Sequence, residues 1–170
     1  MFTVKPVSIP LNSAICQHLP GAQFFDAFET TLARPEQSAL EIYLAMIART
    51  PSWAAYLMDI RNRVAKRAGL TTLQGIGPDD PAKPASAYQV GDRIGIFTVA
   101  ALTDNEVILA ASDTHLDVRC SMLKHVVGNR TKSVLSSVVH IHNSLGYAYM
   151  AVVGPAHKVI ATAMLDTVSV

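Results

Sequence analysis

Apolar and polar residues alternate through much of the second half of the chain, a pattern typical of β-strands. Four segments carry this pattern, at 93–102, 106–112, 116–126 and 131–142. Turns are predicted between them at Asp104-Asn105, Asp113-Thr114 and Gly128-Asn129, because Asp, Asn and Gly readily adopt turn conformations. A single strand from 106 to 126 would be unusually long, so we expect a break at Asp113-Thr114. The four strands then form an antiparallel meander.

Helices are predicted on both sides of this meander. Ser38 and Glu41 form a capping box, and apolar residues follow them at helical spacing as far as Thr50-Pro51. A second short helix after Pro51 has its apolar stripe at Trp53, Leu57, Ile60 and Val64. Asn143 can cap a long closing helix over about 145–165. Because this helix is apolar almost all round, we expect a wide face of it to pack against the sheet.

The remaining segments complete a single domain over residues 1–170. Residues 1–21 contain three prolines and are expected to form an extended lead-in, and residues 70–92 form a Gly/Pro-rich loop. Residues 23–32 are rich in Phe and Thr and suit a helix or a strand, of which we favour the strand. The order of elements predicts an α+β fold in which a curved antiparallel sheet grips the long C-terminal helix, with two short helices after the first strand.

The turn at Gly128-Asn129 also predicts the register of the last two strands. If it is a two-residue hairpin turn, Leu116 faces Ile141, Val118 faces Val139 and Met122 faces Leu135, which gives one apolar face. On the other face Asp117 meets His140, and His115 meets His142. A slip of one residue would mix the two faces, so the apolar pairing supports this register.

The same register gathers polar residues near the start of the closing helix. The candidate ligand-binding residues are Asp113, His115, Asp117, Arg119, His140, His142 and Asn143, with Tyr149 reaching toward them from the helix. A His–Asp pair can act as general acid or base, and imidazoles with carboxylates can bind a divalent metal. The spacing matches no strong zinc signature, so we predict no metal site. The alternative is a solvated outer face of an antiparallel sheet, where His–Asp cross-strand pairs are common.

Two further features have a functional and a structural interpretation. Arg61, Arg63, Lys66 and Arg67 could contact an anionic partner, but basic residues are also typical of a solvated helix end. Tyr149 could reach a pocket, but aromatic residues on an apolar helix usually belong to the core. His157 on the same helix is isolated in the sequence, and we interpret it as a histidine of the core or its rim.

Composition narrows the functional classes. Half of the 170 residues are hydrophobic and 16% are charged, which excludes a disordered chain. A net charge of +1 argues against nucleic acid as a partner. Two cysteines cannot form a disulfide framework, and the N-terminus lacks the pattern of a signal peptide, so we expect a cytoplasmic protein. The longest apolar run, 145–156, is shorter than the roughly 20 residues that a membrane span needs.

Three stretches of the chain resemble a known family. They are Asp113-Thr-His-Leu-Asp-Val-Arg119, Val139-His-Ile-His-Asn-Ser-Leu-Gly146 with Tyr149, and Pro155-Ala-His157. Pro51-x-Trp53 and Arg61-Asn-Arg63 are similar too. With them the chain resembles the bacterial domain-of-unknown-function 2867 family from roughly Leu19 onward. The resemblance implies membership of the START-like superfamily of polyketide cyclases and pollen-allergen-like carriers, in which a helix-grip fold surrounds an apolar cavity.

The resemblance carries no established activity, catalytic residue or cofactor. We expect no cofactor and a small hydrophobic or amphipathic molecule bound in a cavity between the sheet and the closing helix. One alternative is an acid–base enzyme of the cyclase, isomerase or hydrolase type that uses His115, His142 and Asp117, and it requires these side chains to line a pocket. Another is an interaction module for a separate NAD(P)-dependent oxidoreductase, because some relatives are fused to such a domain. Self-association to a homo-oligomer is also left open.

Overall fold

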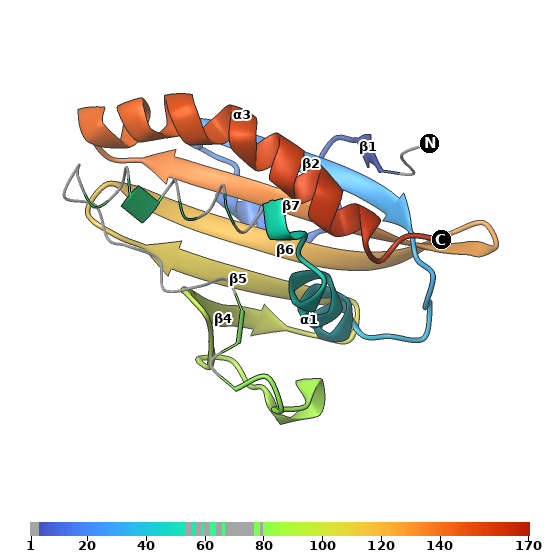
Figure 1. Cartoon of the computed structure of the whole chain (residues 1–170). Helices are drawn as coiled ribbons and strands as arrows, with labels where there is room; N and C mark the ends of the chain where they lie inside the picture. The colour runs from blue at the N-terminus through green and yellow to red at the C-terminus, as the bar shows by residue number, and fades with distance from the viewer. Residues whose placement is uncertain are drawn as a thin grey trace.

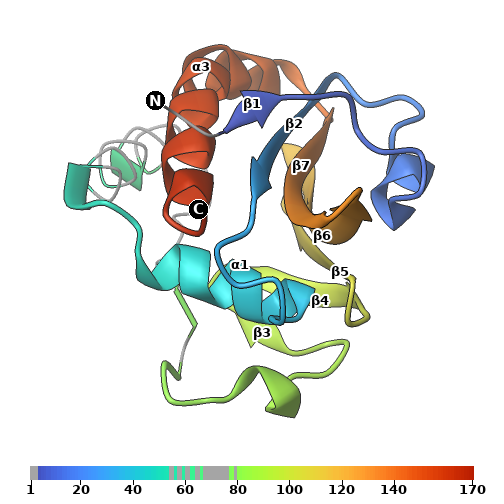
Figure 2. The same cartoon turned by 90° about the vertical axis from the view of Figure 1, so that its right-hand side faces the viewer.

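The structure is a computed structural model that describes residues 4–53, 56, 59, 62–63, 66, 77–78 and 80–170. One seven-stranded antiparallel sheet has the order β1-β2-β7-β6-β5-β4-β3, and it is curved (Figure 2). Its strands are β1 (Lys5–Pro6), β2 (Phe24–Thr31), β3 (Arg93–Ile94), β4 (Phe97–Leu102), β5 (Glu106–Ser112), β6 (Leu116–Val127) and β7 (Arg130–Ile141). The helices whose residues are all described are η1 (Ala14–His18), α1 (Ala39–Ala48), η2 (Ala85–Ala87) and α3 (Ser144–Asp166). The predicted α+β class, with a long C-terminal helix lying along the sheet, is confirmed (Figure 1).

The pairing of β6 with β7 follows the predicted register. Leu116 pairs with Ile141, Val118 with Val139 and Met122 with Leu135, and Val127 faces Arg130 across the turn. Gly128 has a φ of 63°, which a glycine adopts without steric cost. β2 adds to the free edge of β7, so the strand predicted over 23–32 is confirmed and lies beside the last strand of the chain.

The helices α1 and α3 lie on one side of the sheet, and the N-terminal segment with η1 lies on the other (Figure 2). On the helix side, Phe28, Met122 and Leu135 pack with residues of both α1 and α3 in the main core. On the opposite side, Ile15 of η1 is fully buried against Ile108 and Val138. The sheet therefore has a helix side and an N-terminal side, and both bury apolar residues.

The lead-in predicted as simply extended instead contains β1 and η1. Glu106 holds η1 in place, because its carboxylate accepts hydrogen bonds from Ser13 Oγ at 2.5 Å and from the Ala14 amide at 2.9 Å. Ser121 Oγ also donates to this carboxylate, at 2.6 Å. A half-buried carboxylate at the first amides of η1 thus fixes the N-terminal segment across the sheet.

Two other predicted boundaries differ in the structure. The strand predicted over 93–102 is divided into β3 and β4 by a tight turn in which Gly95 has a φ of 60°. Within the loop predicted over 70–92, the described residues form η2 and bury Tyr88. Residues 70–76 lie outside the described part of the chain.

The second predicted helix is described only in part. Ser52, Trp53, Tyr56, Asp59, Asn62, Arg63 and Lys66 are helical, in agreement with the expectation. The other residues of its predicted apolar stripe, Leu57, Ile60 and Val64, lie outside the described residues, as do Arg61 and Arg67 of the basic run.

Both predicted caps are present. At α1 the Ser38 amide donates to Glu41 Oε2 at 2.7 Å, and the Glu41 amide donates to Ser38 Oγ at 3.2 Å. At α3 the Asn143 side chain accepts from the Gly146 amide at 3.1 Å. The side chains of Ser38 and Asn143 thus cap the N-termini of α1 and α3.

α3 packs against the sheet by a narrower face than its sequence predicts. Tyr149, Met164 and Leu165 are buried, whereas Val152 and Val159 on its outer side are 67% and 56% exposed. α3 lies over β2 and β7 as an outer layer (Figure 1). Among the described residues, only the side of α3 that faces these strands is therefore covered. By length and composition alone α3 could cross a membrane, a test that helices covering a sheet also pass.

Candidate functional site

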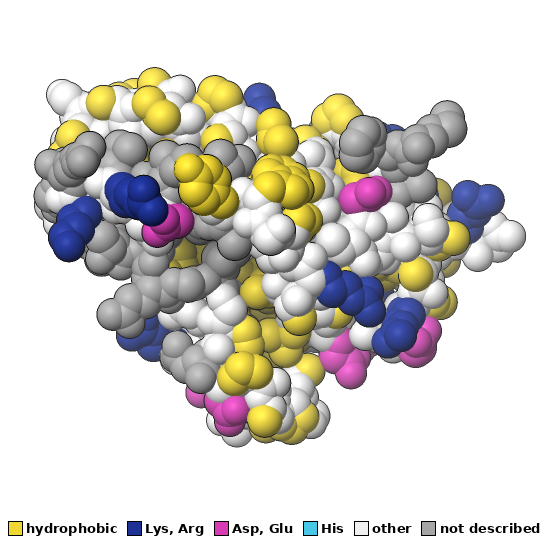
Figure 3. Space-filling view, in the orientation of Figure 1, with side chains coloured by type: hydrophobic (Ala, Val, Ile, Leu, Met, Phe, Trp, Pro, Cys, Tyr) yellow, Lys and Arg dark blue, Asp and Glu magenta, His cyan; other side chains and the backbone are white. Residues whose placement is uncertain are grey.

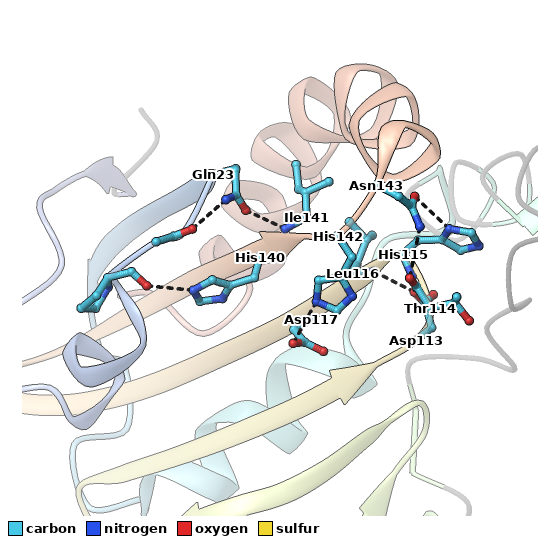
Figure 4. A network of polar contacts seen from close by, with 12 residues as sticks. Gln23, Asp113, Thr114, His115, Leu116, Asp117, His140, Ile141, His142 and Asn143 are labelled. Carbon is cyan, nitrogen blue, oxygen red and sulfur yellow. Dashed lines mark hydrogen bonds and ion pairs between the residues drawn. The ribbon is translucent and has the colours of Figure 1, made fainter.

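The predicted polar cluster lies mainly on the N-terminal side of the sheet. Asp117 and Arg119 of β6 and His140 of β7 share this side with Val138, which contacts Ile15. Figure 4 shows Ile141 directed toward α3, while His140 and His142 on either side of it are directed away. The acid–base alternative requires His115, His142 and Asp117 to line a pocket. The pleat directs Asp117 and His142 to the side of the sheet opposite α3.

The side chains of Asp117 and His142 lie at ion-pair distance, and each is about one-third exposed. Their Oδ2 and Nε2 atoms are 3.1 Å apart, and the side chains are 32% and 39% exposed. A hydrogen bond from Ser112 holds the pKa of Asp117 below its usual value, with further contributions from His142 and Arg119. Asp117 pairs with His140 in register as predicted, but its side chain contacts His142 instead.

His140 and Arg119 lie beside the N-terminal segment. His140 Nε2 is 3.1 Å from the carbonyl oxygen of Pro20, so it donates a hydrogen bond there. Burial lowers the pKa of His18 in η1, and the nearby charges of Arg119 and His140 lower it further. These residues therefore contact the segment that covers this side of the sheet.

The residues around the β5–β6 turn fix the start of α3. Asp113 Oδ1 accepts from the amides of His115 and Leu116 at 2.7 and 2.8 Å, which closes the turn. Asn143 Oδ1 lies 3.0 Å from His115 Nδ1, and Asn143 Nδ2 donates to the Thr114 carbonyl at 3.2 Å (Figure 4). Because Asn143 Oδ1 can only accept, this contact assigns the proton to His115 Nδ1. His115 thus joins the turn to the helix cap.

The predicted site residues other than Arg119 have a hydrogen-bonding or packing partner within the protein, and Arg119 acts on His18 and Asp117 through its charge. Tyr149 is buried against Leu116 and Val139, as expected of a core residue. Within the described residues, no group of three His, Cys, Asp or Glu side chains could hold a metal ion. A ligand contact for these eight residues stays a prediction.

A second polar cluster lies on the helix side of the sheet, under α3. It consists of Asp26 of β2, Cys120 of β6, Ser137 of β7 and His157 of α3, and we call it the helix-side cluster. Ser137 pairs with Asp26 on one neighbouring strand and with Cys120 on the other, so the three lie in one row across the sheet. His157 Nε2 lies 3.1 Å from Ser137 Oγ and 3.6 Å from Asp26 Oδ1. His157, interpreted from the sequence as isolated, therefore has two polar neighbours.

Asp26 is the unusual member of the helix-side cluster. Its side chain is 10% exposed, and both carboxyl oxygens are buried. Neither oxygen has a hydrogen-bond partner among the described residues. Buried carboxyl oxygens are nearly always hydrogen-bonded, because removing them from water without a partner costs free energy. Such an acceptor under a helix is a candidate contact for a ligand.

The Cys120 thiol is not a candidate nucleophile. Burial raises its pKa to about 12, the Asp26 charge acts in the same direction, and a hydrogen bond with Ser137 opposes both. Burial also raises the pKa of Tyr43 in α1, with Cys120 adding to the shift. Both groups are protonated at neutral pH and contribute polarity without charge.

Two residues of the sheet beside the helix-side cluster are only partly buried. Val118 and Cys120 lie on β6, the central strand, and face the helices, yet both are only half-buried. Val118 contacts the main core on one flank and the Leu116, Val139 and Tyr149 cluster on the other. Figure 3 shows hydrophobic side chains at the surface below α3 on this side of the molecule. Among the described residues, Val118 and Cys120 are therefore positions on the helix side of the sheet that keep part of their surface exposed.

A surface hollow of about 440 Å³ lies away from this cluster, and it is polar. It is lined by Asn12, Thr103, Asn105, Glu106, Leu123, Lys124, His125 and Val126. Its charged groups have partners, because Glu106 holds η1 and Lys124 Nζ donates to the Gln37 carbonyl at 2.8 Å. His125 Nε2 lies 3.5 Å from Glu29 Oε2. The two charged groups Glu106 and Lys124 are therefore engaged within the protein, whereas His125 Nε2 has no hydrogen-bond partner among the described residues.

Sequence reasoning missed the helix-side cluster because its members are far apart in the chain. One signal was available in β2, where Asp26 alternates with Phe24 and Phe28 and so shares their core-facing side. A charged residue at an apolar position of a strand indicates a buried polar contact. Ser137 and Cys120 give no such signal, because small residues are common in buried strands.

The family comparison covers nearly all of this structure. The model of the family described as "protein of unknown function (DUF2867)" matches residues 18–164. The matched region runs from the end of η1 almost to the end of α3 and contains all four members of the helix-side cluster. None of the curated proteins matches the chain.

Proposed function

The chain belongs to the DUF2867 family of proteins of unknown function, and we propose that it binds a small, largely apolar molecule between α3 and the sheet. The observation that carries the proposal is the partial exposure of Val118 at the centre of the sheet, on the side where the helices lie. Protein interiors are close-packed, so apolar residues at this depth are normally covered by neighbouring side chains. A bound apolar molecule would cover them.

The surroundings of Val118 support an apolar ligand. Phe24, Ile141, Met150 and Val153 are partly buried hydrophobic residues that pack around the same small cluster. Pockets for small molecules are mostly apolar and contain a few polar groups that set orientation. The helix-side cluster supplies such groups at one end. This arrangement also suits the START-like helix grip, to which we assign the chain as part of the proposal.

A neutral fluorophore that brightens in apolar surroundings, N-phenyl-1-naphthylamine, tests the proposal. We expect saturable binding to the native protein and its loss in Val118→Trp, because the larger side chain fills the proposed space. Val126→Trp is the matched control, since Val126 lies on the same strand and is 70% exposed. It should bind the fluorophore normally.

Circular dichroism shows whether each variant is folded, and Val118→Phe provides a milder filling substitution. The proposal is overturned if the folded native protein does not bind the fluorophore. It is also overturned if a folded Val118 variant binds as well as the Val126 control.

A further inference from the structure

Resting on the proposed function, we infer that Asp26 receives a hydrogen-bond-donating head group, a hydroxyl or an ammonium, of the bound molecule. The ligand class is then a small amphipathic molecule with an apolar body and a donor at one end. The donor would meet the Asp26 carboxyl, and the apolar body would lie over Val118 and Cys120.

The hydrogen-bond inventory of the helix-side cluster supports a missing donor. Ser137 pairs with Cys120 on the neighbouring strand and lies 3.1 Å from His157 Nε2, and a hydroxyl has one proton to donate. If Ser137 donates to Cys120, its oxygen can accept the proton of His157 Nε2. The distances agree with this, because His157 Nε2 is closer to Ser137 Oγ, at 3.1 Å, than to Asp26 Oδ1, at 3.6 Å. The cluster thus satisfies its own donors and leaves Asp26 as a free acceptor.

The position of Asp26 favours a ligand as the source of that donor. Asp26 lies in the same row of the sheet as Cys120, whose half-buried surface faces the proposed binding space. The ring of Phe24 contacts the edge of His157, with centroids 6.0 Å apart, and forms an apolar wall beside the carboxyl. An anionic head group would be repelled by Asp26, and an ester or ether would leave its oxygens unpaired.

A series of ligands with one chain length tests the inference by displacement of N-phenyl-1-naphthylamine. Decan-1-ol and decylamine carry a donor, whereas methyl decanoate and decanoate present only acceptors. We expect the native protein to bind the better donor ligand about tenfold or more tightly than methyl decanoate, as one additional hydrogen bond to a carboxyl would give. Comparison of the alcohol with the amine identifies which donor the site prefers.

Two variants of Asp26 assign the preference to this side chain. In Asp26→Asn and Asp26→Leu we expect the preference for donor ligands over methyl decanoate to fall to within about threefold. The control is Glu36→Gln, which removes an exposed carboxylate and should keep the native preference. The melting temperature of ligand-free Asp26→Leu should equal or exceed that of the native protein, because an unpaired buried carboxyl is removed.

The outcomes separate this inference from the proposed function. If native protein binds the fluorophore but prefers methyl decanoate or decanoate, the inference is wrong and the proposed function stands. A donor preference that persists in folded Asp26 variants also overturns it, and so does a lowered melting temperature in Asp26→Leu, which would assign Asp26 a structural role. Failure of the fluorophore and the whole series to bind would overturn the proposed function itself. The comparison of ligands on native protein tests the inference even if the variants do not fold.

Discussion

Gly146 lies against the backbone of His115, and this contact sets how closely α3 approaches the β5–β6 turn. A Cβ atom at Gly146 would be 2.7 Å from the His115 carbonyl oxygen and 2.8 Å from Ile141 Cγ2. The His115 carbonyl is fixed, because it accepts a hydrogen bond from the His142 amide at 2.9 Å. The absence of a side chain at residue 146 thus allows the helix to begin directly above the sheet.

Gly146→Ala should therefore destabilise the protein although alanine favours helices. We expect a loss of about 1–3 kcal/mol in the free energy of unfolding, as for other insertions into a packed contact, measured by urea denaturation. Gly154→Ala in the same helix is the control. Its Cβ would meet Phe24 at an ordinary 3.5 Å, and only the following Pro155 disfavours a Cβ there, so we expect a loss below about 1 kcal/mol. Equal effects of the two substitutions would contradict the role of the His115 contact.

The hydrogen bonds of Asn143 give a second prediction. Asn143→Ala removes the cap of α3 and the contacts with His115 and Thr114, so it should cost about 1–2 kcal/mol. His115→Ala should cost about 0.5–1.5 kcal/mol. Because the two side chains contact each other, the double variant should lose less than the sum by at least about 0.5 kcal/mol.

A second double variant provides the comparison for Asn143 and His115. Ser38 caps α1, and none of its described hydrogen bonds involves His115. The losses of unfolding free energy in Ser38→Ala and His115→Ala should therefore add in the double variant. Additivity in both pairs would show that the His115–Asn143 hydrogen bond contributes nothing to stability.

The lowered pKa of Glu29 leads us to expect that the stability of the protein depends on pH. Burial alone would raise its pKa, but hydrogen bonds and charges from Lys132 and Lys5 hold the pKa of Glu29 below its ordinary value of 4.5. A lowered pKa in the folded state stabilises the protein above the unfolded-state value. That contribution is lost as the pH falls from about 4.5 through the folded-state pKa.

Glu29→Gln should remove this contribution. We expect a loss of about 1–3 kcal/mol at pH 7 and a smaller difference from the native protein at pH 3, from urea denaturation at both values. Glu36→Gln, at an exposed carboxylate, should change neither value appreciably. A loss that is as large at pH 3 as at pH 7 would assign the effect to packing instead of charge.

The sequence predicts the centre of the sheet well and its surroundings less well. Gly128-Asn129 and the alternation on both sides of it determine the β6–β7 register, because a slip would bury Asp117 and expose Val118. The sequence did not predict that the strand over 93–102 is divided at Gly95. Apolar residues continue on both sides of this turn, and the turn depends on the positive φ of Gly95. Coverage by η1 was missed because prolines indicate extended chain and cannot show which surface that chain packs on.

The candidate site shows the same limit. The His–Asp register was predicted, but a register does not say which side of a sheet carries the helices. That depends on where α3 and the N-terminal segment pack, which are contacts between distant parts of the chain. Asp26 and His157 are 131 residues apart in sequence (157 minus 26), and their approach at 3.6 Å exists only in the folded structure.

The Cys120 thiol gives a prediction about the helix-side cluster that needs no ligand. With a pKa of about 12, its thiolate fraction at pH 8 is about a thousandfold or more below that of an ordinary cysteine. In Cys16→Ser protein, which keeps Cys120 as its one cysteine, iodoacetamide should therefore react slower by about that factor than it does in urea. Mass spectrometry of the alkylated protein measures both rates.

The pH dependence and Ser137 then identify the cause of the slow reaction. If ionisation limits the rate, alkylation should keep rising beyond pH 10, above the range in which an ordinary thiol is already ionised. Ser137→Ala should slow the reaction further at pH 8, because the hydrogen bond from Ser137 lowers the pKa of Cys120. Faster reaction in Ser137→Ala, or a rate that levels off near pH 9, would contradict this account. The thiol would then be an ordinary one, and burial in the helix-side cluster would not control its ionisation.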